Sequence, residues 1–233
     1  MILGILGGMG PAATCDFFNK IIQNTPASKD QDHIHVLIDS NSQIPDRTQY
    51  ICGSGEDPRN EMIKSAIRLE MMGADYITIP CNTAHYFYND VKQYTKANVL
   101  NMILETALYL KKMNSGKQEY LLLATEGVYA GGVYKKTFED LGMKIIIPND
   151  TDKKTVMSWI YNVKANNYDV SPKEFDTLVD KYITDRNTPI ILGCTELPLL
   201  AEKIGLMRNL VDPVTILAKR CVEIAENDKH RSC

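Results

Sequence analysis

The 233-residue sequence lacks any run that approaches the roughly 20 consecutive apolar residues required by a membrane-spanning helix. It also lacks a long basic run, and its formal net charge at pH 7 is −3. Nucleic acids and anionic membranes are therefore poor candidate partners, because both attract clustered positive charge. The apolar N-terminal stretch MILGILGGMGP has no positively charged segment and soon reaches Gly-Gly and Pro, which predicts a strand rather than a signal peptide. We expect a cytoplasmic protein.

Cysteine pairs with C-x-x-C spacing are also absent, although the sequence contains six cysteines. The spacing thus gives no indication of a zinc site or a thioredoxin-type motif, and we expect no bound metal. Disulfides are rare in a reducing compartment, so each thiol is assessed by itself. Cys15 and Cys221 fall on predicted helices and are expected to be small buried apolar residues. Cys233 lies in a charged tail, 228–233, which we expect to fray.

What the sequence does contain is an alternation of short apolar runs with helix-like segments. The predicted strands cover residues 2–6, 34–38, 76–80, 120–124, 144–147 and 189–192. The helical segments include 59–72, followed by Gly73 where a C-terminal cap is expected, and 199–206. Continuous apolar strands separated by helices are typical of parallel sheets with helices on both faces, so the predicted fold class is α/β.

Two pairs of motifs recur at nearly the same offset along the chain. LGGMGPAATCDFF, which begins at residue 6, resembles LATEGVYAGGVYK and aligns Gly10 with Gly127, an offset of 117 residues (127 − 10). Cys81 and Cys194, each at the end of an apolar run and each followed by two polar residues, are offset by 113 residues (194 − 81). This recurrence indicates an internal duplication of an α/β unit.

The duplication predicts two pseudo-symmetric domains that face each other across a cleft. We place the first domain at 1–100 and the second at 101–207, because loop signals occur between residues 98 and 117. The last predicted helix, within 208–227, is expected to return to the first domain.

A glycine-rich stretch, GMGPAA at residues 8–13, follows the first predicted strand and fits the G-x-G-x-x-A fingerprint of a dinucleotide fold. Asp39 ends the next strand, where a ribose-binding acid is expected, so an NAD-dependent oxidoreductase is one interpretation. Pro11 counts against it, because it removes a backbone N–H that such a turn presents to pyrophosphate. Alternatively, the glycines only permit a tight strand-to-helix turn, or the N–H groups of the turn bind a small carboxylate. These three interpretations stay open on the residues alone.

The two recurring cysteines indicate a particular chemistry. Open α/β sheets bind ligands beyond the carboxyl ends of their strands, so two facing domains would bring Cys81 and Cys194 to one cleft from opposite walls. One thiolate and one protonated thiol are suited to removing a proton from one face of a carbon and returning a proton to the other. Asn82, Thr83 and Thr195 would offer short donors to a carboxylate and to the enolate-like charge formed on proton loss. The pattern therefore predicts racemisation or epimerisation without a cofactor.

Five motifs together carry a family resemblance. GGMGP, IPDRT, PCNTAH, LLATEG and LGCTEL occur in this order, and the chain from residue 2 to about 220 resembles the PLP-independent aspartate/glutamate racemase family, most closely its aspartate racemase branch. The resemblance implies two pseudo-symmetric α/β domains, a homodimer, no cofactor and an acidic amino acid as the small-molecule substrate. It also implies that Cys81 and Cys194 are the acid/base residues that interconvert L- and D-aspartate.

The same resemblance implies a set of substrate-binding residues. Arg47, in IPDRT, would bind the second carboxylate of aspartate, for which the guanidinium is well suited, and Lys164 would assist it. Glu196 would orient Cys194 or bind the substrate ammonium. The other residues implied to bind substrate are Gly8, Met9, Asn82, Thr83, Thr125 and Thr195.

Other functions are compatible with parts of this pattern. A glutamate racemase or a broad-specificity amino-acid racemase would use the same two thiols. An NAD-dependent oxidoreductase would leave the two cysteine motifs without a role, and an amino-acid-binding protein would need neither thiol. His85 is expected to pack or to cap a helix, with an influence on the thiol of Cys81 as the alternative.

Overall fold

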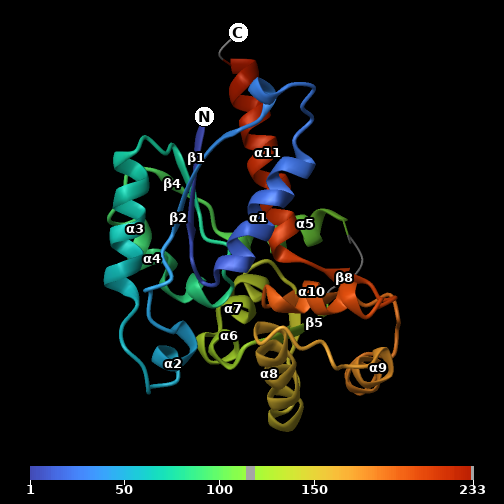
Figure 1. Ribbon diagram of the computed structural model, residues 1–233. Coiled ribbons are helices and arrows are strands. Elements are labelled where there is room, and N and C mark those ends of the chain that lie inside the picture. The colour runs from blue at the N-terminus through green and yellow to red at the C-terminus, as the bar shows by residue number, and fades with distance from the viewer. Residues whose placement is uncertain (114–118, 232–233) are drawn as a thin grey trace.

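The structure, a computed structural model, describes residues 1–113 and 119–231 (Figure 1). Two four-stranded sheets, both parallel, have the strand orders β2-β1-β3-β4 and β6-β5-β7-β8. The strands are β1 Ile2–Gly7, β2 His35–Ser40, β3 Tyr76–Thr78, β4 Asn98–Val99, β5 Glu119–Ala124, β6 Lys144–Ile146, β7 Ile190–Gly193 and β8 Leu210–Val211. The predicted α/β class is confirmed, and the second sheet repeats the strand order of the first.

The six predicted strands are present, and each boundary shifts by no more than two residues. The continuous apolar runs mark them because the central strands are buried on both faces, as in β1 and β5. The sequence missed β4 and β8, which have two residues each and are too short to form an apolar run.

Helices cover both faces of each sheet, and their ends follow ordinary capping chemistry. They are α1 Pro11–Asn24, η1 Asp30–Asp32, α2 Arg47–Ile51, α3 Arg59–Met71, η2 Thr83–Phe87, α4 Tyr88–Lys92, α5 Met102–Met113, α6 Glu126–Gly131, α7 Val133–Glu139, α8 Asp150–Lys164, α9 Pro172–Val179, α10 Glu196–Lys203 and α11 Pro213–Arg231. Side chains of Thr125, Asn149 and Ser171 accept backbone N–H groups at the starts of α6, α8 and α9. Gly73 follows α3 with φ +98°, a left-handed conformation that favours glycine.

One helix prediction was displaced. The segment predicted at 199–206 is helix α10, which begins at Glu196 and ends at Lys203. Pro198 lies within its first turn, where a proline is tolerated because the N–H that it lacks has no intrahelical acceptor.

The long C-terminal helix α11 packs beside α1 at the first sheet (Figure 1). Leu217 and Cys221 of α11 share a buried cluster with Leu3 of β1 and Phe17 of α1. The burial predicted for Cys221 is confirmed, whereas the same prediction for Cys15 was wrong. Cys15 is exposed because α1 turns the neighbouring side chains, not this one, toward the core.

The two ends of the described chain lie close together. The amino group of Met1 is 2.8 Å from a carboxylate oxygen of Asp228. Helix α11 continues through Arg231, so the predicted frayed tail begins as helix, and residues 232 and 233, including Cys233, lie outside the described residues. Between the sheets, α5 occupies much of the segment in which the domain boundary was placed, and residues 114–118 of that segment also lie outside the description.

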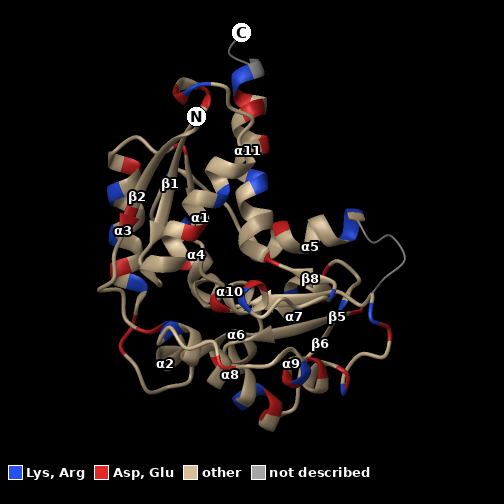
Figure 2. Cartoon of the chain, turned by 45° about the vertical axis from the view of Figure 1, so that its right-hand side comes forward, with Lys and Arg blue, Asp and Glu red and all other residues tan. Residues whose placement is uncertain are grey.

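Charged residues of both signs are interspersed over the outer helices (Figure 2). Within the described chain, no helix has the length and apolar composition needed to cross a bilayer.

Candidate active site

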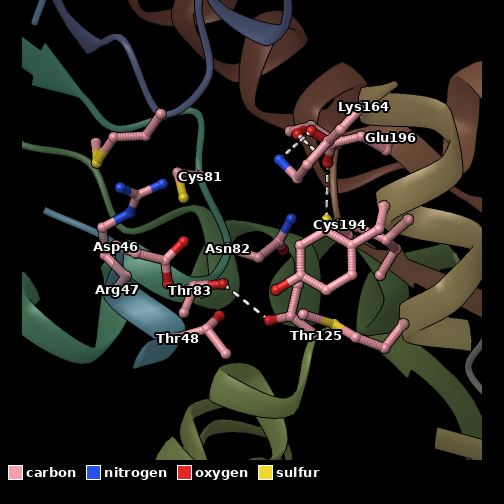
Figure 3. A pocket seen from close by; sticks show the side chains of 16 residues that line it. Asp46, Arg47, Thr48, Cys81, Asn82, Thr83, Thr125, Lys164, Cys194 and Glu196 are labelled. Atoms are coloured by element: carbon pink, nitrogen blue, oxygen red, sulfur yellow. Dashed lines mark hydrogen bonds and ion pairs between the residues drawn. The ribbon is translucent and has the colours of Figure 1, made fainter. Parts of the chain in front are cut away.

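A pocket lies where the loops after the strands of both sheets meet (Figure 3). It contains about 470 Å³ of space free of protein atoms, including its open mouth. Of the predicted site residues, it brings together Met9, Arg47, Cys81, Asn82, Thr83, Thr125, Lys164, Cys194, Thr195 and Glu196. The site thus lies at the carboxyl ends of the parallel strands, as expected for open α/β sheets, and helix α8 also contributes to its lining.

The two cysteines enter the pocket from different sheets. Cys81 lies three residues beyond the end of β3, and Cys194 follows the end of β7 directly. Both are buried, with 8% of each residue exposed. Both cysteines therefore line one pocket from different halves of the molecule (Figure 3).

His85 fixes the backbone beside Cys81 rather than its sulfur. The Nδ1 atom of His85 lies 2.9 Å from the carbonyl oxygen of Cys81, and Nε2 accepts the backbone N–H of Met102 at 3.0 Å. Because Nε2 is an acceptor, the proton of the neutral ring is on Nδ1 and is donated to the carbonyl. Burial lowers the pKa of His85 to about 4, which keeps the ring neutral. This arrangement agrees with the predicted packing role.

The buried neutral His85 should make folding stability depend on pH. Its pKa falls from 6.5 in the unfolded chain to about 4 in the folded protein, so the unfolded state binds more protons between these values. The free energy of unfolding should be unaffected by this group above pH 6.5 and should decrease as the pH falls toward 4. At pH 5 the expected loss is about 2 kcal/mol. Urea unfolding at pH 7 and pH 5 measures it, and His85→Gln should remove most of this pH-dependent component. An equal pH dependence in wild type and His85→Gln would contradict the assignment.

Cys194 belongs to a relay of three side chains joined by hydrogen bonds and an ion pair. Its Sγ donates to Glu196 Oε2 at 2.8 Å, and Lys164 Nζ lies 2.5 Å from the other carboxylate oxygen, Oε1. Thr195 Oγ1 also donates to Oε2, at 3.0 Å. The carboxylate of Glu196 thus bridges a thiol and an ammonium group.

The electrostatics of this relay favour a thiol at Cys194 and a carboxylate at Glu196. Burial, followed by the adjacent charge of Glu196, raises the pKa of Cys194 well above its ordinary value. Burial also opposes ionisation of Glu196, but the charge of Lys164 and the hydrogen bonds outweigh it and lower the pKa of Glu196. Burial likewise opposes the charge on Lys164, and attraction to Glu196 outweighs it and raises the pKa of Lys164. The proton therefore stays on the sulfur of Cys194.

In the first half of the site no carboxylate stands two positions after the cysteine, although Asp46 of the same half also lines the pocket. The two residues after Cys81 are Asn82 and Thr83, in place of Thr195 and Glu196. Thr83 Oγ1 is hydrogen-bonded to Thr125 Oγ1 across the two halves at 3.0 Å. The two cysteines are thus similar in backbone position and different in electrostatic surroundings.

The pocket also contains buried N–H donors without acceptors. Arg47 Nη1 donates to the carbonyl oxygens of Ile44 and Pro45, at 3.2 and 2.9 Å, which leaves Nε buried without a partner. The Nδ2 atom of Asn82 is likewise buried and unpartnered. Asp46 caps α2 by accepting the Gln49 N–H at 2.8 Å, so its role here is to hold the helix that carries Arg47. Buried donors of this kind are costly unless a ligand supplies an acceptor, and a carboxylate is a suitable one.

Comparison with known proteins identifies the family. The Asp/Glu/Hydantoin racemase family profile matches residues 6–221. The chain belongs to this family. It is therefore an isomerase of a PLP-independent racemase family, as the motifs predicted.

Relatives of this racemase family cover nearly the full chain. The broad specificity amino-acid racemase RacX of Bacillus subtilis (strain 168) is 28% identical over 95% of this chain and 96% of its own. The structure of Picrophilus torridus aspartate racemase has 31% identity, with a TM-score of 0.81 over 95% of this chain and 94% of its own. Glutamate racemase from Francisella tularensis subsp. tularensis SCHU S4, in complex with D-glutamate, shares the fold with a TM-score of 0.68 and 17% identity, over 97% of this chain and 81% of its own.

The glycine-rich turn before α1 lacks the features of a dinucleotide-binding site, in agreement with family membership. Gly8 is the one predicted site residue that does not line the pocket. Its φ is +86°, and its N–H donates to Thr14 Oγ1 at 2.9 Å, so it shapes the turn. Asp39, the expected ribose-binding acid, forms an ion pair with Arg68 at 2.8 Å. The dinucleotide interpretation is therefore set aside.

The racemase site includes residues that sequence reasoning missed. Gly127, at the start of α6, approaches the first half so closely that a Cβ would lie 2.8 Å from Thr48 Oγ1 and from Thr83 Cγ2. The alignment with Gly10 had drawn attention to Gly127, but nothing in the sequence predicts its close approach to Thr48. Gly127 itself does not line the pocket, and the pocket residues that were not predicted include Thr48, Met157, Ile160, Tyr161 and Gly193.

Proposed function

We propose that the protein is a cofactor-independent amino-acid racemase that interconverts L- and D-aspartate through Cys81 and Cys194. The observation that carries this proposal is that two cysteines from different sheets line one pocket together with residues that have unpartnered N–H donors. Membership of the racemase family and the similarity to an aspartate racemase support it.

In the proposed reaction the resting enzyme holds a thiolate at Cys81 and a thiol at Cys194. Cys81 takes the proton from Cα, and the electrons of the broken C–H bond move into the α-carboxylate as an enediolate. Cys194 then gives its proton to the opposite face of Cα, which restores the carboxylate with inverted configuration. The enzyme is left with a thiol at Cys81 and a thiolate at Cys194, and it either runs the reverse reaction or returns to the resting state by proton exchange with solvent.

Aspartate carries a second carboxylate, and Arg47 is the proposed partner. Lys164 is already paired with Glu196, so its charge is largely balanced within the protein. Arg47 uses Nη1 for backbone carbonyls and retains Nε for a ligand. The side of the guanidinium that carries Nε matches the two oxygens of a carboxylate.

Proton NMR in D₂O tests the proposal directly. L-aspartate and, separately, L-glutamate are incubated with the reduced protein without added cofactor. Loss of the α-proton signal of aspartate, with D-aspartate on a chiral column, is the expected result. Exchange of glutamate instead would assign the protein as a glutamate racemase, and exchange of neither substrate by the folded, reduced protein would overturn the aspartate proposal.

Arg47→Ala should raise KM for aspartate about tenfold, with a smaller effect on the racemisation of alanine or another substrate without a second carboxylate. The variant removes the proposed partner of that group and no buried apolar core. Arg68→Ala, which removes an ion pair with Asp39 outside the pocket, is the matched control. Equal losses for aspartate and alanine would show that Arg47 does not recognise the second carboxylate.

A broad-specificity racemase is the second candidate. A wider cavity adjoins the pocket and shares Thr48, Met157 and Tyr161 with it. This cavity contains about 910 Å³ of space, including its mouth, which gives room for side chains larger than that of aspartate. Similarity to RacX also favours this candidate. Comparable exchange rates for aspartate and for long-chain amino acids such as lysine would support it over strict aspartate specificity.

We further propose that the enzyme acts as a homodimer, as the family resemblance implies. Light scattering of the purified protein should give twice the chain mass of 26.2 kDa. The cytoplasmic location stays a prediction from the sequence.

A further inference from the structure

The amide of Asn82 is held by a residue from the other half of the molecule. Tyr134, in α7, donates its hydroxyl to Asn82 Oδ1 at 2.6 Å. Both side chains are buried, with 1% of Tyr134 and 3% of Asn82 exposed. Tyr134 does not line the pocket, so it reaches the site only through Asn82.

This bond determines which way the amide faces. Burial, followed by the charge of Asp212, raises the pKa of Tyr134 well above its ordinary value, so the phenol keeps its proton. Within the described part of the chain, Asn82 Oδ1 is the acceptor for that proton. A reversed amide would present its NH₂ group to the phenol and leave the phenol proton buried without an acceptor, which is unfavourable.

The fixed orientation leaves Asn82 Nδ2 as a buried donor without a partner. In Figure 3 this nitrogen is directed into the space between Cys81 and Cys194. An α-carboxylate in this space would supply the acceptor. The hydrogen bond would strengthen as Cα loses its proton, because negative charge then moves onto the carboxylate oxygens.

We propose that Tyr134 is a positioning residue that fixes the Asn82 amide so that Nδ2 donates to the α-carboxylate of the substrate and to the enediolate formed from it. This inference rests on the proposed racemase function. Asn82 touches the substrate, whereas Tyr134 acts through Asn82.

Tyr134→Phe removes the hydroxyl and keeps the ring, which packs against Phe138 with centroids 5.9 Å apart. We expect kcat for α-proton exchange to fall about tenfold with little change in KM. The orientation of the Asn82 amide matters most in the transition state, when negative charge develops on the carboxylate oxygens. Asn82→Ala should cost at least as much. The double variant should be no slower than Asn82→Ala alone, since Tyr134 acts only through Asn82. Independent, multiplying losses in the double variant would overturn the inference.

Tyr88→Phe is the matched control. The Tyr88 hydroxyl donates to the carbonyl oxygen of Val99 at 3.0 Å, and Tyr88 does not line the pocket. The control should retain the wild-type exchange rate. A tenfold loss in this control as well would mean that the effect of Tyr134→Phe reflects only the general loss of a hydrogen-bonded tyrosine hydroxyl, and would overturn the inference.

A readout independent of catalysis separates this inference from the proposed function. The side-chain ¹⁵N amide signal of Asn82, assigned by its loss in Asn82→Ala, is followed during titration with L-aspartate. It should shift in wild type and shift much less in Tyr134→Phe. If wild type exchanges no amino acid but the signal still behaves this way, the racemase proposal fails and the positioning role stands. If wild type racemises aspartate and Tyr134→Phe matches it in both rate and shift, the positioning role fails and the racemase proposal stands.

Discussion

Cys81→Ala and Cys194→Ala should each abolish racemisation, with kcat lowered about 10³-fold or more. Inversion at Cα needs a proton acceptor on one face and a donor on the other, and alanine can be neither. The two thiols are the proposed acid/base groups, and they line the pocket from different sheets. Chiral chromatography of the products measures the loss, and persistent racemisation in either variant would contradict the two-cysteine mechanism.

The two variants should still exchange the α-proton with solvent, but at different rates. Each retains one thiol, which can remove and return a proton on its own face for one enantiomer. Cys194→Ala retains Cys81, which has Thr83 rather than a carboxylate two positions on. Cys81→Ala retains Cys194, whose raised pKa and hydrogen bond to Glu196 keep it protonated at neutral pH, so little thiolate is available to accept a proton.

We therefore expect Cys194→Ala to exchange one enantiomer in D₂O at pH 7.5, and Cys81→Ala to exchange the other much more slowly, with a rate that increases as the pH rises. Cys15→Ala, which changes an exposed thiol on α1 outside the pocket, is the control and should retain full activity. Equal exchange by the two single variants at pH 7.5 would show that the surroundings of the thiols do not distinguish them.

The sequence was informative wherever a local pattern reflects burial or chain geometry. The strands were predictable because β1, β5 and β7 are buried on both faces and so consist of continuous apolar residues. Cys81 and Cys194 could be placed at strand ends for the same reason, and parallel strand ends converge at one edge of a sheet. Most of the predicted pocket followed from this rule and from the family motifs.

Contacts between distant residues were not predictable. Nothing near Tyr134 in the sequence indicates that its hydroxyl meets Asn82, 52 positions away. Lys164 was expected beside Arg47 as a substrate ligand, whereas the structure pairs it with Glu196, 32 positions along the chain. Its binding role stays a prediction, but the ion pair is a property of the folded chain that depends on α8 and α10 packing together.

Glu196→Gln should lower the racemisation rate about 100-fold at neutral pH and shift the basic limb of the pH profile to lower pH. The carboxylate of Glu196 accepts a hydrogen bond from the Cys194 thiol. Burial raises the pKa of Cys194, and the negative charge of Glu196 raises it further because it repels the thiolate. Without that charge, and with Lys164 left unpaired nearby, the thiolate becomes easier to form. In the proposed mechanism Cys194 must be protonated to act as the acid, so a lower pKa of Cys194 means that the active form is lost at lower pH.

Two measurements distinguish this role from a structural one. The other thiols and the tyrosines also absorb near 240 nm when ionised, so the signal of Cys194 is taken as the difference between the titrations of Cys81→Ala and Cys81→Ala/Cys194→Ala. This difference should show a lower apparent pKa for Cys194 when Glu196 is glutamine. The aromatic neighbours Tyr129 and Tyr134 have pKa values raised by burial, so they contribute little to this titration. Glu202→Gln, which alters an exposed residue on the same helix α10, should change neither the rate nor the titration. A slower Glu196→Gln enzyme with an unchanged Cys194 titration would mean that the carboxylate orients the thiol without raising its pKa. The proposed difference in protonation between Cys81 and Cys194 would then need another cause.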